Sequence, residues 1–158
     1  MTEQKAGQLI ELLRNRELRC RTGILLLSNE WLGQEPNVAA RLGIDYLDYA
    51  KVLQEAFSYG TAYVDIDTSS EVNRLDGMAS DLTSSDCILI YNIDLALSKL
   101  DVYSRYTLWN GVWEKLSNRR VALIIAVPEG ARRLLPDTES LEHWVSSGRI
   151  AGYGSAEN

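Results

Sequence analysis

The hydrophobic positions of the chain follow two alternating patterns. Residues 24–27, 87–91 and 121–127 are nearly continuous apolar runs, which are typical of strands buried on both faces of a parallel sheet. Shorter apolar runs predict two further strands at 44–47 and 149–153. Between these runs, apolar residues recur three and four positions apart, as they do on one face of a helix. The predicted helices cover residues 4–18, 36–42, 48–57, 68–82, 101–117 and 138–147.

This alternation of strands and helices predicts an α/β fold, a three-layer sandwich in which helices cover both faces of a mostly parallel sheet. The chain has 158 residues, the size of one domain, and no repeat or linker divides it. We expect a single domain over 1–158, with an N-terminal helix within 1–20 and a flexible tail at 154–158. Residues 62–67 fit either a short strand or an extended loop.

The composition and net charge indicate whether the chain is globular and which kinds of partner it is expected to bind. Apolar residues make up 46% and charged residues 24% of the chain, which indicates a globular protein and not a disordered one. The net charge of -6 argues against direct DNA binding through a broadly basic surface. A local arginine cluster near the N-terminus keeps an accessory DNA-contacting subunit as an alternative. The cluster consists of Arg14, Arg16, Arg19 and Arg21.

The sequence also bears on the cellular compartment. The longest apolar run, 121–127, is far shorter than the roughly 20 residues of a membrane span. The first 20 residues are charged throughout and contain no apolar signal-peptide core. Cys20 and Cys87 are too few for a disulfide framework. We therefore expect a cytoplasmic protein with free thiols and no membrane partner.

Few residues are available for catalysis. His143 is the single histidine, and it lies in a predicted helix without a nucleophile motif nearby. No cysteine and histidine cluster has the spacing of a zinc site. We predict no catalytic residue and no metal site, and we expect His143 to lie on a helix surface or at a helix end.

The loop after the first strand is where a phosphate-binding loop is expected. Such a loop needs glycines whose neighbouring amides surround phosphate, a lysine for the outer phosphates, and a Ser or Thr for magnesium. Here the loop has Gly33 but no lysine, and it carries Glu30 and Glu35, which repel phosphate. Trp31 is too bulky for close backbone approach. The degenerate phosphate-loop positions are Ser28, Asn29, Gly33 and Asn37.

The strand at 87–91 ends where a magnesium-positioning acid is expected. The strand ends in Tyr91 and is followed by Asn92 and Asp94, which are the degenerate metal-motif positions. Asp94 either contacts a metal or water, or caps a turn or pairs with a nearby cation. Three further residues are candidate partner contacts: Trp31, in a polar turn, and Arg119 and Arg120, which follow a helix and also suit its C-terminal dipole.

The order of these segments resembles the BrxF family, small P-loop proteins of BREX phage-defence systems. The resemblance covers residues 23–153, and its more specific part is 86–128. It is carried by the motif Tyr91-Asn92-Ile93-Asp94, by the helix end at 116–120, and by the apolar strand that Pro128 closes. The resemblance implies a P-loop NTPase-like fold. The phosphate-loop lysine and hydroxyl are missing and Tyr91 replaces the magnesium aspartate, so it also implies a pseudo-ATPase without a cofactor.

These observations lead to one expected function and two alternatives. The expected function is a non-catalytic interaction or regulatory subunit of a prokaryotic multi-protein antiviral system of the BREX type. Its partners are other proteins of the defence complex, and self-association into a homo-oligomer is left open. The first alternative is a nucleotide-binding switch or ATPase, in which an unorthodox loop at 29–37 holds ATP and Asp94 handles magnesium. The second is the accessory DNA-contacting subunit.

Overall fold

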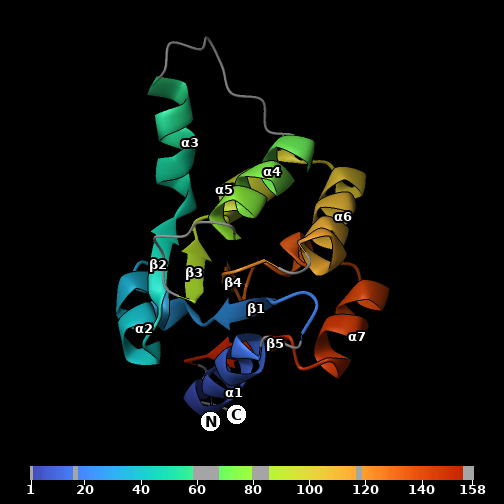
Figure 1. Cartoon of the computed structure of the whole chain (residues 1–158). Coiled ribbons are helices and arrows are strands. Elements are labelled where there is room, and N and C mark those ends of the chain that lie inside the picture. The colour runs from blue at the N-terminus through green and yellow to red at the C-terminus, as the bar shows by residue number, and fades with distance from the viewer. Residues whose placement is uncertain (1, 16–17, 59–67, 80–85, 117–118, 155–158) are drawn as a thin grey trace.

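The computed structural model describes residues 2–15, 18–58, 68–79, 86–116 and 119–154. Its centre is a sheet of five parallel strands in the order β2-β3-β4-β1-β5 (Figure 1). The strands are β1 (Thr22–Leu27), β2 (Asp45–Asp48), β3 (Cys87–Tyr91), β4 (Ala122–Pro128) and β5 (Ile150–Tyr153). The predicted strands at 24–27, 44–47, 87–91, 121–127 and 149–153 are thus confirmed to within two residues.

The described part of the chain also contains seven α-helices and three shorter helical segments, and all of them except α1 lie between strands in the sequence. The α-helices are α1 (Thr2–Arg14), α2 (Glu35–Leu42), α3 (Tyr49–Ser58), α4 (Thr68–Ala79), α5 (Asp94–Lys99), α6 (Val102–Asn110) and α7 (Thr138–Ser146). Two 3-10 turns span Asn29–Trp31 and Arg132–Leu134, and a π-helical segment, Gly111–Lys115, continues α6.

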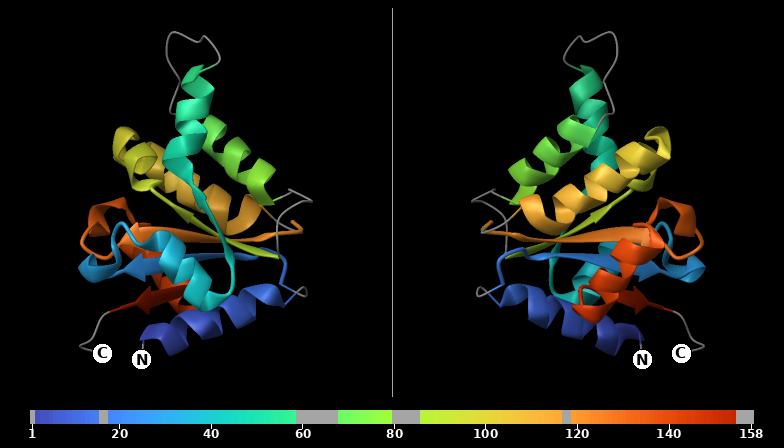
Figure 2. Two further views of the ribbon diagram at one scale, coloured as in Figure 1. Left: turned by 90° about the vertical axis from the view of Figure 1, so that its left-hand side faces the viewer. Right: turned by 90° about the vertical axis from the view of Figure 1, so that its right-hand side faces the viewer.

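The helices form a layer on each face of the sheet (Figure 2). Leu9 and Leu13 of α1 and Val38 of α2 belong to one buried apolar cluster, on the sheet face that Leu25 and Leu27 present. Helices α3 to α7 pack on the other face, where Ile24 contributes to a second cluster. Because successive side chains of a strand point to opposite faces, the apolar strands supply both clusters. The three-layer α/β sandwich with a parallel sheet is confirmed.

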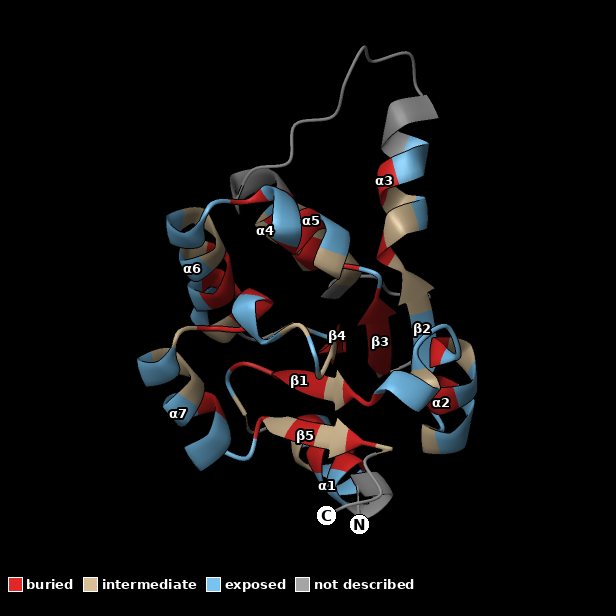
Figure 3. Ribbon diagram, turned by 180° about the vertical axis from the view of Figure 1, so that it is seen from behind, coloured by how far each residue is buried: buried red, intermediate tan, exposed pale blue. Residues whose placement is uncertain are grey.

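Strand β3 shows why continuous apolar runs predict such a sheet. All five of its residues are buried, and Figure 3 shows the strand entirely in the buried colour. Its side chains alternate between the two clusters: Ile88 and Ile90 join the α3–α7 side, whereas Cys87 and Leu89 join the α1 and α2 side. A strand covered on one face alone would carry polar residues at every second position.

Two sequence predictions about helices need correction. Residues 94–99 form α5, which the hydrophobic pattern did not predict, because a six-residue helix has no measurable periodicity. The predicted helix at 101–117 divides into α6 and the π-helical segment. The apolar spacing of a helix over 101–117 places Val102 and Tyr106 in one stripe on the same face as Trp109, but these two residues are 71% and 37% exposed. The first turns of α6 therefore extend beyond the core, and only the later part of the stripe is buried.

Smaller differences concern the chain ends and the linking segments. Helix α1 ends at Arg14, four residues before the predicted end. The stretch 62–67 and the tail residues 155–158 lie outside the described residues. Gly154, the first residue of the expected tail, is described and lies against Trp31. Within the described residues, no helix combines the length and apolar character that crossing a membrane requires.

Candidate functional site

The strand order places a topological switch at the carboxyl ends of β1 and β4. The chain leaves β1 toward α2 on one face, whereas it leaves β4 toward α7, whose Trp144 belongs to the cluster on the other face. In parallel α/β sheets, the place where connections diverge in this way, beyond the carboxyl ends of the strands, is the usual ligand position. Ser28, one of the positions expected for a degenerate phosphate loop, directly follows β1 at this place.

The loop after β1 is folded back on itself. Residues Asn29–Trp31 form a 3-10 turn. The amide of Trp31 donates to the Ser28 carbonyl at 3.0 Å, and the amide of Leu32 donates to the Asn29 carbonyl at 3.3 Å. The amide of Gln34 donates in turn to the Trp31 carbonyl at 3.0 Å. The loop thus makes three successive turns in which backbone amides donate to carbonyls of the loop itself. These three amides are therefore not directed at an anion.

The other positions that the sequence analysis assigns to a degenerate phosphate loop have roles in local structure. Gly33 is exposed and has φ of 85°, a left-handed conformation that favours glycine. Asn37 lies in the first turn of α2, and its amide donates to the Gln34 carbonyl at 2.9 Å. The amide of Ser28 donates to the Tyr153 carbonyl at 3.1 Å, which joins the end of β1 to the end of β5.

The indole of Trp31 covers the end of β5. It packs edge-on against Tyr153 with ring centroids 5.2 Å apart, and the guanidinium of Arg41 lies over its ring at 5.0 Å. A Cβ atom added to Gly154 would lie 2.0 Å from Trp31 Cδ1, so the indole lies directly against this glycine. Trp31 is half-buried, and this packing leaves only part of its surface for the partner contact that the sequence suggested.

Carboxylates surround this end of the sheet. The Ser28 hydroxyl donates to Glu30 Oε1 at 3.2 Å, and Glu35 is buried in the first turn of α2. Burial raises the pKa of Tyr91, and the negative charges of Asp48 and Glu35 raise it further. The tyrosine at the end of β3 therefore stays protonated and neutral. The negative charges of these carboxylates disfavour the binding of a further anion at this end of the sheet.

The segment after β3 forms a tight connection to β2. Asn92 has φ of 61°, a left-handed conformation that asparagine adopts more readily than most residues, and its side-chain amide donates to Asp48 Oδ1 at 3.0 Å. The same Asp48 oxygen accepts from the amide of Ala50 at 3.0 Å. Asp94 lies in the first turn of α5, where its charge favours the helix dipole. Among the described residues, no group of three or more His, Cys, Asp or Glu side chains is placed to hold a metal ion.

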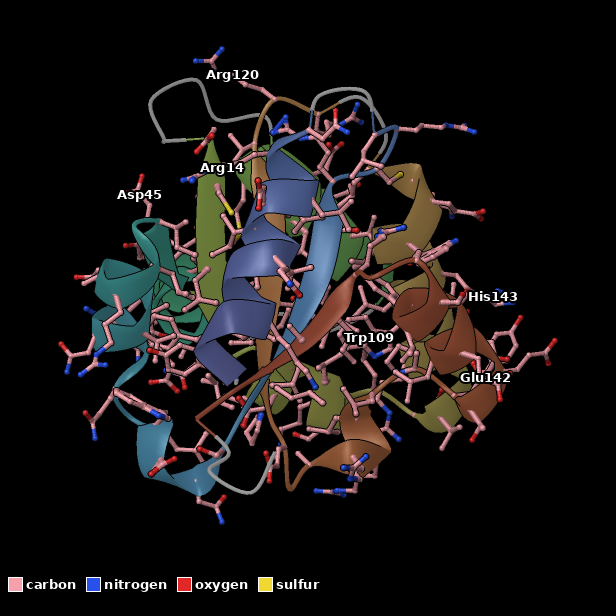
Figure 4. The ribbon with its side chains drawn as sticks, turned by 90° about the horizontal axis from the view of Figure 1, so that it is seen from below. Arg14, Asp45, Trp109, Arg120, Glu142 and His143 are labelled. Atoms are coloured by element: carbon pink, nitrogen blue, oxygen red, sulfur yellow. The ribbon has the colours of Figure 1, made fainter. Side chains whose placement is uncertain are left out.

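The remaining candidate partner contacts lie at the opposite end of the sheet, where the strands begin. Arg119 and Arg120 precede β4, at its amino end, so the structure does not bring them together with Trp31. Arg119 forms an ion pair with Asp76 of α4. Arg120 is exposed, its carbonyl accepts from Arg21 Nη2 at 2.9 Å, and its side chain extends away from the ribbon (Figure 4). Of the two arginines, Arg120 is thus the more open to a partner.

The N-terminal arginines do not gather into one open basic face. Arg14 forms an ion pair with Asp86 at 3.1 Å, and Arg21 is buried, at 6% exposure. Arg19 is exposed, and Arg16 lies outside the described residues. His143 is exposed on α7, and its side chain is seen on the outer face of that helix in Figure 4.

The sequence did not indicate the exposed apolar side chains of α5 and α6. Leu95, Val102 and Tyr103 are 51%, 71% and 81% exposed. One signal was present: consecutive residues of a helix point about 100° apart, so Val102 and Tyr103 cannot both face the core. These three side chains, called the α5–α6 patch below, are apolar and aromatic groups of the type that protein interfaces use.

Comparisons with protein-family models, with curated proteins and with solved structures find no significant match to this chain. The functional argument therefore depends on the geometry of the strand ends and on the exposed surface.

Proposed function

We propose that this chain is a non-catalytic α/β protein of P-loop NTPase-like architecture, an interaction or regulatory subunit of a cytoplasmic BREX-like antiviral defence system. The observation that carries the proposal is the inward-bonded loop after β1. Its amides at Trp31, Leu32 and Gln34 donate to carbonyls within the loop, and an indole packs over the neighbouring strand end. A phosphate ligand would have to replace these contacts.

The architecture supports the P-loop-like part of the proposal. In the parallel sheet, β1 lies between β4 and β5, and the loop after β1 leads to α2 on one face of the sheet. The connections that follow β3 and β4 lie on the other face. The first strand of a P-loop protein likewise ends at the switch crevice, with its phosphate loop leading into a helix. Fold alone does not determine function, so the chemistry of the loop has to decide.

That chemistry argues against nucleotide turnover. The loop lacks the lysine that contacts the outer phosphates and the hydroxyl that binds magnesium. The Ser28 hydroxyl donates to Glu30, and Glu35 lies buried nearby. Two carboxylates beside a triphosphate raise its free energy of binding, because like charges repel strongly in a partly desolvated site. A protein of this design acts through the partners that its surface contacts.

The first experiment measures the melting temperature with ATP and magnesium. A ligand present at 100 times its dissociation constant stabilises the folded state by about 2.7 kcal/mol. For a chain of this size that corresponds to a rise of roughly 8 °C. The proposal expects no rise at millimolar nucleotide. A saturable rise of several degrees would contradict it and would support the alternative of a nucleotide-binding switch.

The second experiment tests the partner role directly. The tagged chain is co-expressed with the other proteins of a BREX-like system, and the proteins that co-purify are identified. The proposal expects a stoichiometric complex that Tyr103→Asp weakens, because the charge is placed in the α5–α6 patch. Val145→Asp, at an exposed apolar residue of α7, is the matched control. Recovery of no system protein, with the chain folded, contradicts the proposal.

A further inference from the structure

A cavity of about 380 Å³ lies at the amino ends of the strands, away from the loop after β1. Its walls come from the last turns of α1, from residues before β1, from the π-helical segment and from residues just before β5. Leu12, Leu18 and Trp113 supply apolar surface, and Cys20 and Arg149 supply polar atoms. A volume of this size lies within the range of sites that hold small organic molecules, which is about 300–1,000 Å³.

The guanidinium of Arg149 is the unusual component of this cavity. Arg149 is only 7% exposed, and two of its nitrogens bind the protein. Nε donates to the Thr22 carbonyl at 2.7 Å, and Nη2 donates to the Thr22 hydroxyl and to the Trp113 carbonyl at 3.3 Å. Within the described part of the chain, Nη1 has no acceptor, and no carboxylate oxygen lies within 4.0 Å of the guanidinium.

Aromatic rings hold this buried charge in place. The guanidinium lies 3.9 Å from the ring centroid of Trp113 and 4.6 Å from that of Trp144. Such cation–π contacts compensate part of the lost hydration and prevent the group from turning toward solvent. Burial lowers the pKa of Arg149 to about 10, so the group is charged at neutral pH although the protein supplies no anion among the described residues. An anion in the cavity would complete an ion pair.

The other polar groups limit what kind of anion fits. The Cys20 thiol donates to the Glu114 carbonyl at 3.3 Å, and burial raises its pKa, so it is a neutral group and not a nucleophile. The side chains of Arg19 and Glu114 are exposed at the rim, and their opposite charges offset each other. One guanidinium nitrogen and mostly apolar walls suit a single negative charge on an apolar body, and not a polyphosphate.

We propose that this cavity binds a small organic monoanion, a carboxylate on an apolar or aromatic body, with the carboxylate on Arg149 Nη1 and the body against Trp113 and the two leucines. This site is separate from the loop after β1, so it stands whether or not nucleotide binds there. The proposal is one of binding and not of reaction, because the Cys20 thiol is neutral and bonded to the Glu114 carbonyl, and the Glu114 side chain lies exposed at the rim.

The test uses isothermal titration calorimetry with phenylacetate, and with phenylacetamide as the neutral ligand of the same shape. We expect saturable phenylacetate binding at one site, at least 10-fold tighter than phenylacetamide. Equal affinities, binding of neither compound, or binding of inorganic phosphate in preference to phenylacetate would each overturn the proposal.

Variants locate the ligand. Arg149→Lys keeps a charge but loses the planar fork, and it should weaken phenylacetate binding at least 10-fold. Because this change also removes hydrogen bonds to Thr22, Leu12→Trp is the second variant, which fills the cavity and leaves Arg149 intact. Arg41→Lys and Leu32→Trp, at the other end of the sheet, are the matched controls. Unchanged affinity in a folded Leu12→Trp protein overturns the proposal, as does equal weakening by the controls.

Discussion

Replacement of Tyr49 by Phe tests a buried link between α3 and α4. The Tyr49 hydroxyl donates to Glu71 Oε1 at 2.5 Å, and both side chains are fully buried, at 0% exposure. Arg74 forms an ion pair with the same carboxylate. The substitution removes one hydrogen bond to a buried charged group and leaves the ion pair in place.

The expected cost follows from the type of bond. A hydrogen bond to a charged group contributes about 1.5–3 kcal/mol, so Tyr49→Phe should lower the free energy of unfolding by about 2 kcal/mol at pH 7. In a chain of this length the melting temperature should fall by roughly 6 °C. Tyr103→Phe, at an 81% exposed tyrosine, should change neither quantity measurably.

The pH dependence provides a sharper test of the same bond. Burial raises the pKa of Tyr49, and the hydrogen bond and negative charge of Glu71 raise it further. The stability that this group contributes is therefore complete below the unfolded tyrosine pKa of about 10, and it is lost as pH rises above that value because the unfolded chain ionises. Linkage gives a loss of about 1.4 kcal/mol between pH 9 and 11, which the phenylalanine variant does not suffer.

Urea unfolding followed by tryptophan fluorescence, at pH 7, 9, 10 and 11, measures both effects. The difference in unfolding free energy between the wild type and Tyr49→Phe should shrink from about 2 kcal/mol at pH 7 to roughly 0.6 kcal/mol at pH 11. A difference below 0.5 kcal/mol at neutral pH, or one that stays constant to pH 11, would refute the reasoning.

Two further substitutions and one thiol-modification experiment test other parts of the structure. Gly154→Ala should lower stability by about 1–3 kcal/mol in urea unfolding and shift tryptophan fluorescence, since φ is 88° and the new Cβ overlaps Trp31; an unaltered spectrum would contradict this packing. Trp109→Phe should cost about 2 kcal/mol in thermal unfolding, because it removes the 2.8 Å bond from Nε1 to the buried Leu134 carbonyl; a stability equal to the wild type speaks against that bond. Burial raises the pKa of Cys87 to about 12, so Ellman's reagent at pH 8 should modify this thiol only after urea is added, and rapid modification of the native protein at this residue would be the contrary result.

The sheet was largely predictable because its strands are buried on both faces. The run at 87–91 matches β3 residue for residue, since a parallel strand between two helical layers requires apolar side chains at every position. The predicted helix at 36–42 is likewise followed by a glycine, the residue type that favours a helix end, and Gly43 ends α2 with φ of 70°. These features depend on local chemistry that each segment carries by itself.

The parts that were not predicted depend on contacts between distant segments. Helix α5 has six residues and no side-chain cap, and the burial of Ala96 and Leu97 stabilises it. The start of α6 is exposed because this part of the helix extends beyond the core. The apolar periodicity of a helix shows which of its residues share a face, but it does not show how much of that face other helices or strands cover.

By itself, the sequence determined that this chain forms a parallel α/β sheet and that the loop after its first strand lacks the lysine and hydroxyl of a phosphate site. Both conclusions follow from the residue types present at given positions, because apolar runs favour buried strands and a phosphate site requires particular charged and hydroxyl groups. Only the tertiary structure decided that Trp31 packs on Tyr153, that Arg119 and Arg120 lie at the opposite end of the sheet, and that Arg149 lies buried beside a cavity. These facts depend on the distances between residues far apart in the chain, which folding sets and a linear pattern does not contain.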